Sequence, residues 1–566
     1  MGLLLCVILL LGLPQPAPAR PTQGTAPADL HILNRVKALF AQQQWKAILE
    51  LLPDSRQNPP ELDYYRGMAL AALEQWPEAR AALERGQTKA PLDKRFPVEL
   101  AGIAYKEGRY PAGKKHLQRA LKLDRQDPYA NDFLASLYFL EGNQEAAIKF
   151  WNRIGKPVLE EVQTSPLPRV DPILLDRCYS FAPASPLRRQ DYLSTRARLD
   201  LLHIFSSYRL ELIPRQDGKF DSFLRPLERN GWGSSTLEGL VSLFRGLPYQ
   251  TVLPEFYNLK GSAYNLRSLV RWDSQKKRAY ASVSGPIAHN PAWRFRFHLD
   301  GRSEKWDISE SVRQAQDAPG EFKLQILKAG VGVDALVGSR WKWGTMVEAA
   351  SRHYRGEPAL AQGFPRFFAE GQGLKQVFQL EHQTVSLPEH RFRLTSSGSV
   401  QWGKILTAAG QPFASVGGRL EWAWFPRARG PDFQITGRLS AAKSMGDTPF
   451  DELYSLGLER DNDLLLRGHS ATRDGKKGAG PVGPHYFLVN LELNKEVYRG
   501  GLWSIVLTPY VDSGKTFDGS GYFGSRVWQW DAGIQLKLMI FERVSLIVSY
   551  GKSLRSGENT LYSTTY

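Results

Sequence analysis

The feature that most constrains the fold is an alternation of apolar and polar residues that recurs from about residue 234 to the C-terminus. Successive side chains of a β-strand point to opposite faces, so each alternating segment predicts a strand with one apolar and one polar face. Frequent turn residues separate the segments, which indicates a large antiparallel sheet. The clearest segments are Trp293–Asp300, Arg419–Trp424, Phe487–Asn494 and Ala532–Met539.

No helical pattern in this region could cover either face of such a sheet. Charges on one face and aliphatic or aromatic residues on the other are typical of a transmembrane barrel with lipid outside and a polar lumen. A sheet in lipid must close, because an open edge leaves backbone groups unpaired in hydrocarbon. Residues 234–566 would supply roughly 16 strands. Interfacial aromatic girdles are expected from Trp341, Trp343, Trp528, Trp530 and Tyr562.

The N-terminus predicts a secretory signal peptide over residues 1–19. Gly2–Leu13 is a short apolar run, and Ala17-Pro18-Ala19 supplies a small-x-small cleavage site. The run is too short to span a bilayer as a helix. After cleavage Cys178 is the one remaining cysteine, so no internal disulfide is expected.

Residues 30–156 repeat with a period of 34 residues. Trp76-Pro77 recurs as Tyr110-Pro111 and as Gln144-Glu145. Small residues at fixed phase allow two helices to approach closely, so we expect stacked helical hairpins. The pattern resembles tetratricopeptide repeats, which implies a concave face for a peptide or protein partner. The alternative is a rigid spacer.

Residues 157–172 contain four prolines and no helical period, which predicts a linker. A small α+β module is then expected over residues 173–233. Its predicted elements are a strand at 173–181, a helix at 192–205, and two strands at 208–213 and 219–227.

Three short motifs stand in the predicted barrel: Leu466–His469 with its Arg-Gly pair, Tyr510–Gly514, and the final Leu561–Tyr566. Together they resemble the BamA–TamA superfamily, also called the bacterial surface antigen family, whose barrels assemble or export proteins at bacterial outer membranes. The resemblance covers roughly residues 170–566. It implies that the α+β module is a POTRA-like domain, which captures extended chains by β-augmentation.

The resemblance also implies a set of site residues. Arg467 and Gly468 match a motif on a long extracellular loop that folds back into the barrel. Asp512 matches the inward acidic partner of the arginine, and Glu492, inward by alternation, is a second candidate. His469 stands where the family usually has an aromatic residue.

The last strand, about 559–566 with Tyr562, Thr564 and Tyr566, is short. It is expected to close the barrel against a first strand near 262–272 through a limited hydrogen-bond ladder. Such a seam could open sideways; the alternative is a permanently closed barrel.

Other classes of function find little support. The net charge of +16 is spread along the chain without a nucleic-acid module, so no nucleic acid is expected as a partner. Gly519–Gly524 matches a dinucleotide pattern, but a predicted strand follows it where a helix is required. No metal-binding, cofactor-binding or nucleophile motif is present, so we expect neither a cofactor nor an enzyme.

The sequence therefore predicts an outer-membrane insertase or translocase with its N-terminal domains in the periplasm. Its partners would be unfolded or extended periplasmic proteins, outer-membrane lipid, and periplasmic or lipoprotein partners bound through the repeats. Two alternatives remain open: a dedicated exporter of one partner protein, in two-partner or surface-lipoprotein secretion, and a passive pore or surface-binding barrel.

Overall fold

The computed structural model describes residues 27–229, 239–240, 243, 246–312, 320–356, 366–407, 410–501, 503–519, 523–525, 527–540 and 544–565. The predicted signal peptide, residues 1–19, lies outside them. The chain forms two compact units, 1–134 and 135–566.

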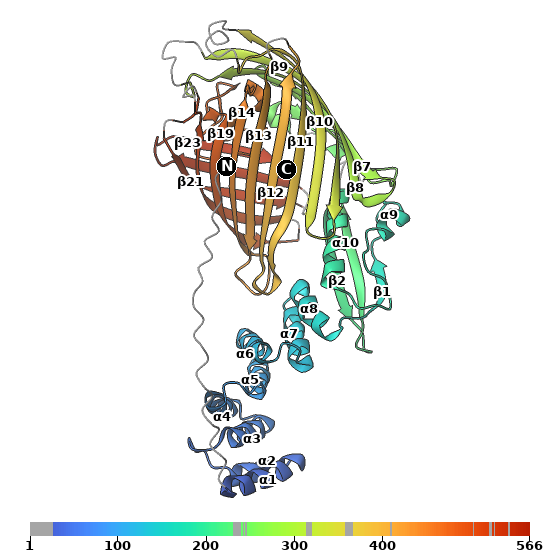
Figure 1. Cartoon of the computed structure of the whole chain (residues 1–566), viewed down its shortest axis with the longest axis vertical. Helices are drawn as coiled ribbons and strands as arrows, with labels where there is room; N and C mark the ends of the chain where they lie inside the picture. Colours follow the sequence, from blue (N-terminus) through green and yellow to red (C-terminus); the bar gives the residue numbers. More distant parts are fainter. Residues whose placement is uncertain are drawn as a thin grey trace. The chain divides into compact units, whose positions relative to one another are not determined.

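The repeat region is a succession of helical hairpins (Figure 1). Helices α4, α6 and α8 begin at Trp76, Tyr110 and Gln144, the three positions marked by the spacing in the sequence. The small residues allow the close approach that was expected, since a Cβ on Gly67 would lie 2.5 Å from Leu83 Cγ. The helices are α1 (Pro27–Ala41), α2 (Trp45–Leu51), α3 (Pro60–Ala72), α4 (Trp76–Lys89), α5 (Arg95–Lys106), α6 (Tyr110–Leu123), α7 (Pro128–Leu140) and α8 (Gln144–Trp151).

The α+β module contains a three-stranded sheet in the order β1-β3-β2, with β1 parallel and β2 antiparallel to β3. Its elements are β1 (Leu159–Thr164), α9 (Pro172–Asp176), α10 (Arg189–Leu202), β2 (Phe205–Pro214) and β3 (Phe220–Glu228). The helix predicted at 192–205 and the last two strands are confirmed, with shifted ends.

Two sequence predictions in this module were wrong. The predicted linker 157–172 contains β1, whose six residues lie between prolines that hid the strand. The strand predicted at 173–181 is instead the short helix α9. Asp171 caps it by accepting a hydrogen bond from the Ile173 amide at 2.8 Å, and Pro172 fits its first turn. Cys178 is buried behind α9, and this burial raises the pKa of its thiol to about 12.

The C-terminal region is a barrel (Figure 1), and its described residues form eighteen strand segments, of which β16 and β17 are two-residue segments of a loop. Because β4 and β5 continue one another along β6 in one register, the other sixteen segments occupy fifteen positions in the wall, close to the roughly 16 strands expected. They are β4 (Thr251–Val252), β5 (Glu255–Leu259), β6 (Tyr264–Trp272), β7 (Lys276–Ile287), β8 (Asn290–Asp307), β9 (Glu321–Val337), β10 (Trp341–Gly356), β11 (Gly371–Leu387), β12 (Phe392–Ile405), β13 (Pro412–Trp424), β14 (Phe433–Gly446), β19 (His485–Arg499), β20 (Trp503–Phe517), β21 (Gln529–Ile540), β22 (Val544–Ser553) and β23 (Asn559–Thr565).

The two faces of the wall differ as the alternation predicted. On β8, Trp293, Phe297 and Leu299 are exposed outside, whereas Arg294 and Asp300 are buried inside. The outward side chains of other strands form the same apolar surface, which suits lipid. None of the described helices is long and apolar enough to cross a membrane.

The strand order closes from β23 to β4. Among the described residues, register pairs join β23 to β22 but not to β4; across this seam the Tyr249 hydroxyl is hydrogen-bonded to Ser563. Thr564 is buried, Tyr562 is half-buried, and Tyr566 lies outside the described residues.

The expected first strand was misplaced. The predicted segment near 262–272 is β6, and β4 and β5 precede it, both paired with β6. Pro254 separates β4 from β5, because proline cannot donate to a ladder and interrupts a strand.

The α+β module meets the barrel at His203, the residue that ends α10. The Asn265 side-chain amide donates to the Leu202 carbonyl at 2.9 Å beside it. Burial, and then the charges of Arg294, Lys342 and other nearby arginines, lower the pKa of His203 to about 3. The folded protein therefore holds this imidazole neutral.

We predict that this junction weakens in acid. The pKa of His203 is lower in the folded state than the ordinary value of about 6.5, so its contribution is complete above pH 6.5 and is lost as the pH falls toward 3. Limited proteolysis of the full chain between pH 7.5 and 4.5 should show increasing cleavage between the module and the barrel. His203→Gln should flatten this pH profile; an unchanged profile would contradict the assignment.

Candidate functional site in the barrel lumen

The segment between β14 and β19, residues 447–484 (here the lumen loop), folds into the barrel. It contains a 3₁₀ turn η4 (Phe450–Glu452) and the short strands β15 (Tyr454–Ser455), β16 (Thr472–Arg473), β17 (Lys476–Lys477) and β18 (Val482–Gly483). Its charged side chains contact inward-facing residues of several strands, so the loop occupies the lumen.

Arg467 is a fully buried cation of the loop, with 1% of its surface exposed. Its Nε and Nη2 donate to the two oxygens of Asp512 at 2.8 and 2.7 Å, and its backbone amide donates to Asp512 Oδ2 at 2.9 Å. Its Nη1 donates to Glu492 Oε1 at 2.5 Å. The structure thus brings Arg467 against both acidic residues named from the sequence.

Gly468 and His469 make a second contact, which the sequence analysis missed. Asp531 on β21 accepts from the Gly468 amide at 2.5 Å and lies 3.0 Å from His469 Nδ1. A Cβ on Gly468 would lie 2.6 Å from Asp531 Cγ and 2.7 Å from the Lys552 carbonyl carbon. Only glycine fits between the loop and the wall here, and the histidine in place of an aromatic residue pairs with the same carboxylate.

Neighbouring groups support this arrangement. Asn490 donates to Asp512 Oδ1 at 2.7 Å and to the Leu465 carbonyl at 2.8 Å. The guanidinium of Arg467 lies over the Tyr510 ring, 3.7 Å from its centroid. The hydroxyl of Thr560, on the last strand, donates to the Arg467 carbonyl.

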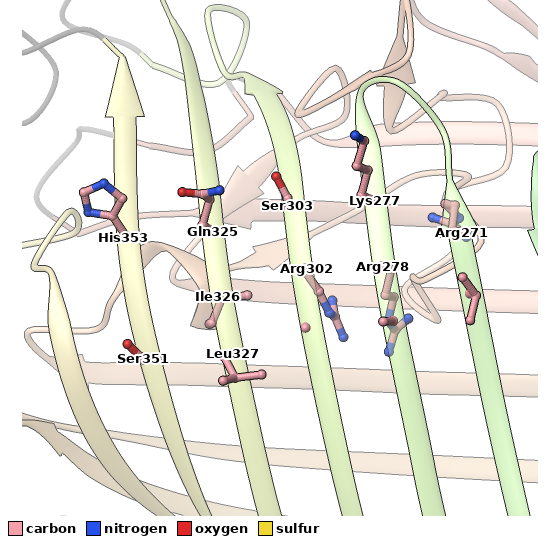
Figure 2. Close-up of a pocket in the computed structure, with 13 residues that line it drawn as sticks. Arg271, Lys277, Arg278, Arg302, Ser303, Gln325, Ile326, Leu327, Ser351 and His353 are labelled. Carbon is pink, nitrogen blue, oxygen red and sulfur yellow. The ribbon is translucent and has the colours of Figure 1, made fainter.

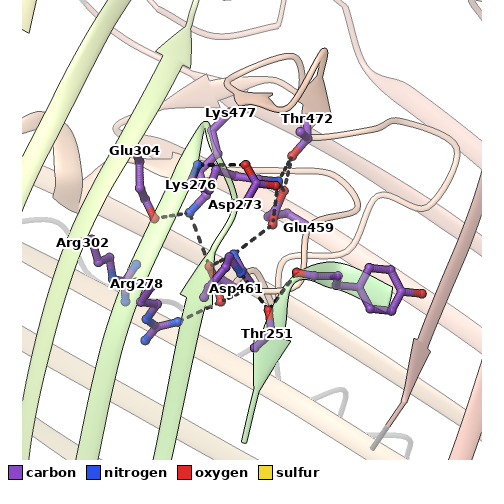
Figure 3. A network of polar contacts seen from close by, with 12 residues as sticks. Thr251, Asp273, Lys276, Arg278, Arg302, Glu304, Glu459, Asp461, Thr472 and Lys477 are labelled. Atoms are coloured by element: carbon purple, nitrogen blue, oxygen red, sulfur yellow. Dashed lines mark hydrogen bonds and ion pairs between the residues drawn. The ribbon is translucent and has the colours of Figure 1, made fainter. Parts of the chain in front are cut away.

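The opposite wall holds the loop through acidic residues of the loop itself (Figure 3). Asp461 accepts from Arg271 at 2.9 Å and from Arg278 at 2.8 Å. Glu459 lies 3.2 Å from Lys276. Lys477, near the end of the loop, lies 2.7 Å from Glu304 of β8.

A third group of contacts involves η4. Asp451 accepts from Arg352 Nε at 2.6 Å and lies 3.0 Å from Lys328. Glu452 lies 2.8 Å from Lys375 and 3.1 Å from Lys328. These contacts attach the start of the lumen loop to β9, β10 and β11.

A sequence pattern could have predicted the contacts of Glu459 and Asp461 and those of η4. Arg294–Asp300 alternation was recognised, but the inward Arg271, Arg278 and Lys328 were not matched to the acids of the loop. A row of inward cations facing a loop with two acidic pairs, Asp451-Glu452 and Glu459-Asp461, is the pattern that would have shown them.

The arrangement is suited to holding a loop. Among the described residues, no group of three or more His, Cys, Asp or Glu side chains is placed to hold a metal ion. The space left between the loop and β8–β9 is a cavity of about 370 Å³ with mixed polar and apolar lining. The ion pairs attach the loop to the wall at three places, each on a different group of strands.

We predict that Arg467→Ala lowers the free energy of unfolding of the barrel by about 3–5 kcal/mol, because Asp512 would stay buried without its partner. The measurement is the temperature at which the full chain in detergent shifts from folded to unfolded mobility on a gel. Arg473→Ala is the matched control, since this arginine lies on the same loop with its side chain 57% exposed. Equal shifts for the two variants would contradict the role of Arg467.

For the opposite wall, Asp461→Asn should lower the same unfolding temperature, at a cost of about 2 kcal/mol, because Arg271 and Arg278 lose a charged acceptor. The effect should be smaller than that of Arg467→Ala, since Asp300 still pairs with Arg278 at 2.8 Å. Asp463→Asn is the control, two residues away with its side chain 80% exposed. A control that destabilises as much as Asp461→Asn would show that this anchor does not hold the loop.

No protein-family model matches this sequence, and no curated protein matches it. Solved structures with a similar fold include BamA from Haemophilus ducreyi lacking POTRA domains 1–3, at 13% identity, covering 72% of this chain and 85% of that one with a TM-score of 0.41. CdiB from Escherichia coli shows 13% identity over 73% of this chain and 77% of its own, with a TM-score of 0.49.

CdiB from Acinetobacter baumannii shows 10% identity over 72% of this chain and 74% of its own, with a TM-score of 0.41. At these identities the likeness is one of fold alone.

Proposed function

We propose that this chain is an outer-membrane protein insertase or translocase, with residues 20–229 in the periplasm. It would capture extended protein substrates and assemble them into the membrane or export them through the barrel. The observation that carries the proposal is the lumen loop, held at three places on the wall around the buried Arg467–Asp512 pair. The proposal includes no catalytic chemistry.

The filled lumen argues against a passive pore. A pore needs a continuous water-filled path, whereas here ion pairs attach the loop to both β6–β8 and β19–β21. A loop with that many buried charges leaves the lumen only if those charges find other partners. Regulated displacement of the loop suits a translocase better than a constantly open channel.

The seam between β23 and β4 is suited to templating a substrate strand. The strand order places the last strand β23 beside the two-residue β4, so the contact between them is short, and a substrate strand could compete for this edge. In hydrocarbon an unpaired edge is costly, which makes pairing with an incoming strand favourable. A substrate strand templated here would gain backbone hydrogen bonds and lipid contact together.

The α+β module and the repeats offer surfaces that could capture an extended protein substrate. In the sheet order β1-β3-β2, strands β1 and β2 are both edges. An extended chain can add to such an edge by β-augmentation, and the repeats add a surface for a protein partner. The driving force would be the folding and burial of the substrate, since no nucleotide is available in the periplasm.

The alternative within transport is the dedicated export of one partner protein. The fold serves both modes, because each needs a periplasmic capture surface and a barrel whose loop can move. Substrate range therefore separates them.

The test is quantitative proteomics of outer membrane and culture medium after depletion of this protein. The proposal predicts that other β-barrels, or one or a few secreted or surface proteins, decrease. A broad decrease in barrels indicates a general assembly factor, and a selective loss with barrels intact indicates a dedicated exporter. No change in either fraction would contradict the proposal.

Complementation sharpens the test. Arg467→Ala should restore substrate levels poorly although the barrel itself is inserted, whereas Arg473→Ala should restore them fully. Full restoration by Arg467→Ala would favour a passive or surface-binding barrel.

A further inference from the structure

The outer wall carries a row of cations on β8, β9 and β10 that take no part in holding the lumen loop. Lys305 on β8 is the register partner of Lys323 on β9, and Lys323 is the register partner of Arg355 on β10. These strand ends lie away from the α+β module, which contacts the β7–β8 turn through Arg177 and the Ala288 carbonyl.

The three side chains point outward. Their chain neighbours Glu304, Leu324 and Tyr354 face the interior: Glu304 pairs with Lys477, Leu324 is buried, and the Tyr354 ring packs on Phe368. Because strand side chains alternate, Lys305, Lys323 and Arg355 lie on the opposite face. Lys305 and Arg355 are exposed and Lys323 is half-buried.

Like charges directly opposite one another destabilise a sheet unless an anion neutralises them. Among the described residues, none of the three forms an ion pair within 4.0 Å. Acids close to the row have other partners: Asp307 accepts from the Ser309 hydroxyl, Glu321 lies 2.5 Å from Lys476, and Glu370 lies 3.0 Å from His353. Within the part of the chain that the structure describes, the row therefore has no acidic partner.

A hollow of about 530 Å³ lies on the same strands (Figure 2), and its lining residues Ser303, Gln325 and His353 stand two positions along their strands from Lys305, Lys323 and Arg355. Lys277, Val270 and Leu327 also line it. Ala279 and Gly301 provide the space, and Ser303, Gln325 and His353 provide hydrogen-bonding groups. Below the hollow, β8 and β9 carry exposed apolar residues, including Leu299 and Val331.

This order along the wall matches the order of groups in a lipid. Acyl chains lie against the apolar band, the polar part of a headgroup fits the hollow, and a phosphate reaches the cations beyond it. Arginine and lysine bind phosphate oxygens by charge-assisted hydrogen bonds. A cation near a membrane surface contributes measurably to binding anionic lipid.

We propose that the outer face of β7–β10 binds a phosphate-bearing membrane lipid, with Lys305, Lys323 and Arg355 as the cations that hold its phosphate. The proposal rests on the membrane placement given under the proposed function, and not on substrate handling. A lipid is favoured over a free phosphate ion because the cations stand directly beyond the lipid-facing band.

The test uses the purified full chain in non-ionic detergent, titrated with phosphatidic acid and followed by native mass spectrometry of bound lipid. Lys305→Gln/Lys323→Gln should weaken binding by roughly thirtyfold, from the contribution of two cations at a membrane surface. Lys305→Arg/Lys323→Arg should bind like the wild type, because charge is kept. Phosphatidylcholine should bind weakly to all of them.

The matched control is Lys404→Gln/Lys443→Gln. These lysines are also exposed on the outer wall, but β13 separates their strands, β12 and β14, so they are not register partners. The control should bind phosphatidic acid like the wild type. An equal loss of phosphatidic acid binding in the two double variants would show non-specific charge attraction and would overturn the proposal.

Two further outcomes overturn it. If Lys305→Gln/Lys323→Gln binds phosphatidic acid like the wild type, with folding verified by gel mobility, these lysines do not hold the lipid phosphate. Competition by millimolar inorganic phosphate as effective as that by lipid would indicate a free-anion site. Because the assay contains no protein substrate, its failure would leave the assembly or export function untouched, and the reverse also holds.

Discussion

The structure depends on the cost of placing charge next to lipid. Where a strand faces hydrocarbon, an ionisable side chain is favoured on the inner face, and an ion inside a barrel is costly unless it is paired. The lumen of this chain consequently contains ion pairs of both signs, with a different balance on its two sides. On β6–β10 the cations Arg271, Lys328 and Arg352 pair with the loop, although acids such as Asp300 and Glu304 also lie on these strands. On β19–β21 the acids Glu492, Asp512 and Asp531 pair with it.

The lumen loop complements this division. Its acidic residues Asp451, Glu452, Glu459 and Asp461 meet cations of β6–β11, and Arg467 and His469 meet acids of β19–β21. The loop and the wall therefore neutralise each other, and neither arrangement is stable alone. Part of the positive charge of the chain is explained by this lining.

The barrel and the repeats could be predicted because their periods are long and regular. The alternation at Trp293–Asp300 and Phe487–Asn494 placed inward and outward residues correctly, and the spacing of Trp76, Tyr110 and Gln144 placed three helices. The α+β module was harder, since β1 is a six-residue edge strand between prolines and α9 is too short to show a period. The pairing of Arg467 with Asp512 came from a resemblance, and Glu492 came from its inward place in the alternation. Asp531, Asp461 and Asp451 were missed because their partners are far away in sequence and only the closed sheet brings them together.

The hydroxyl of Thr560 connects the seam of the barrel with the lumen loop. It belongs to the last strand, and it donates to the carbonyl of the arginine that holds the lumen loop. Any sideways movement of β23 away from β4 strains or breaks this bond, and any release of Arg467 removes an acceptor from β23. Thermodynamic linkage makes such an effect reciprocal: the free energy by which an open seam loosens the loop equals that by which a loosened loop opens the seam. A substrate strand that binds at the edge would thereby act on the interior of the barrel without entering it.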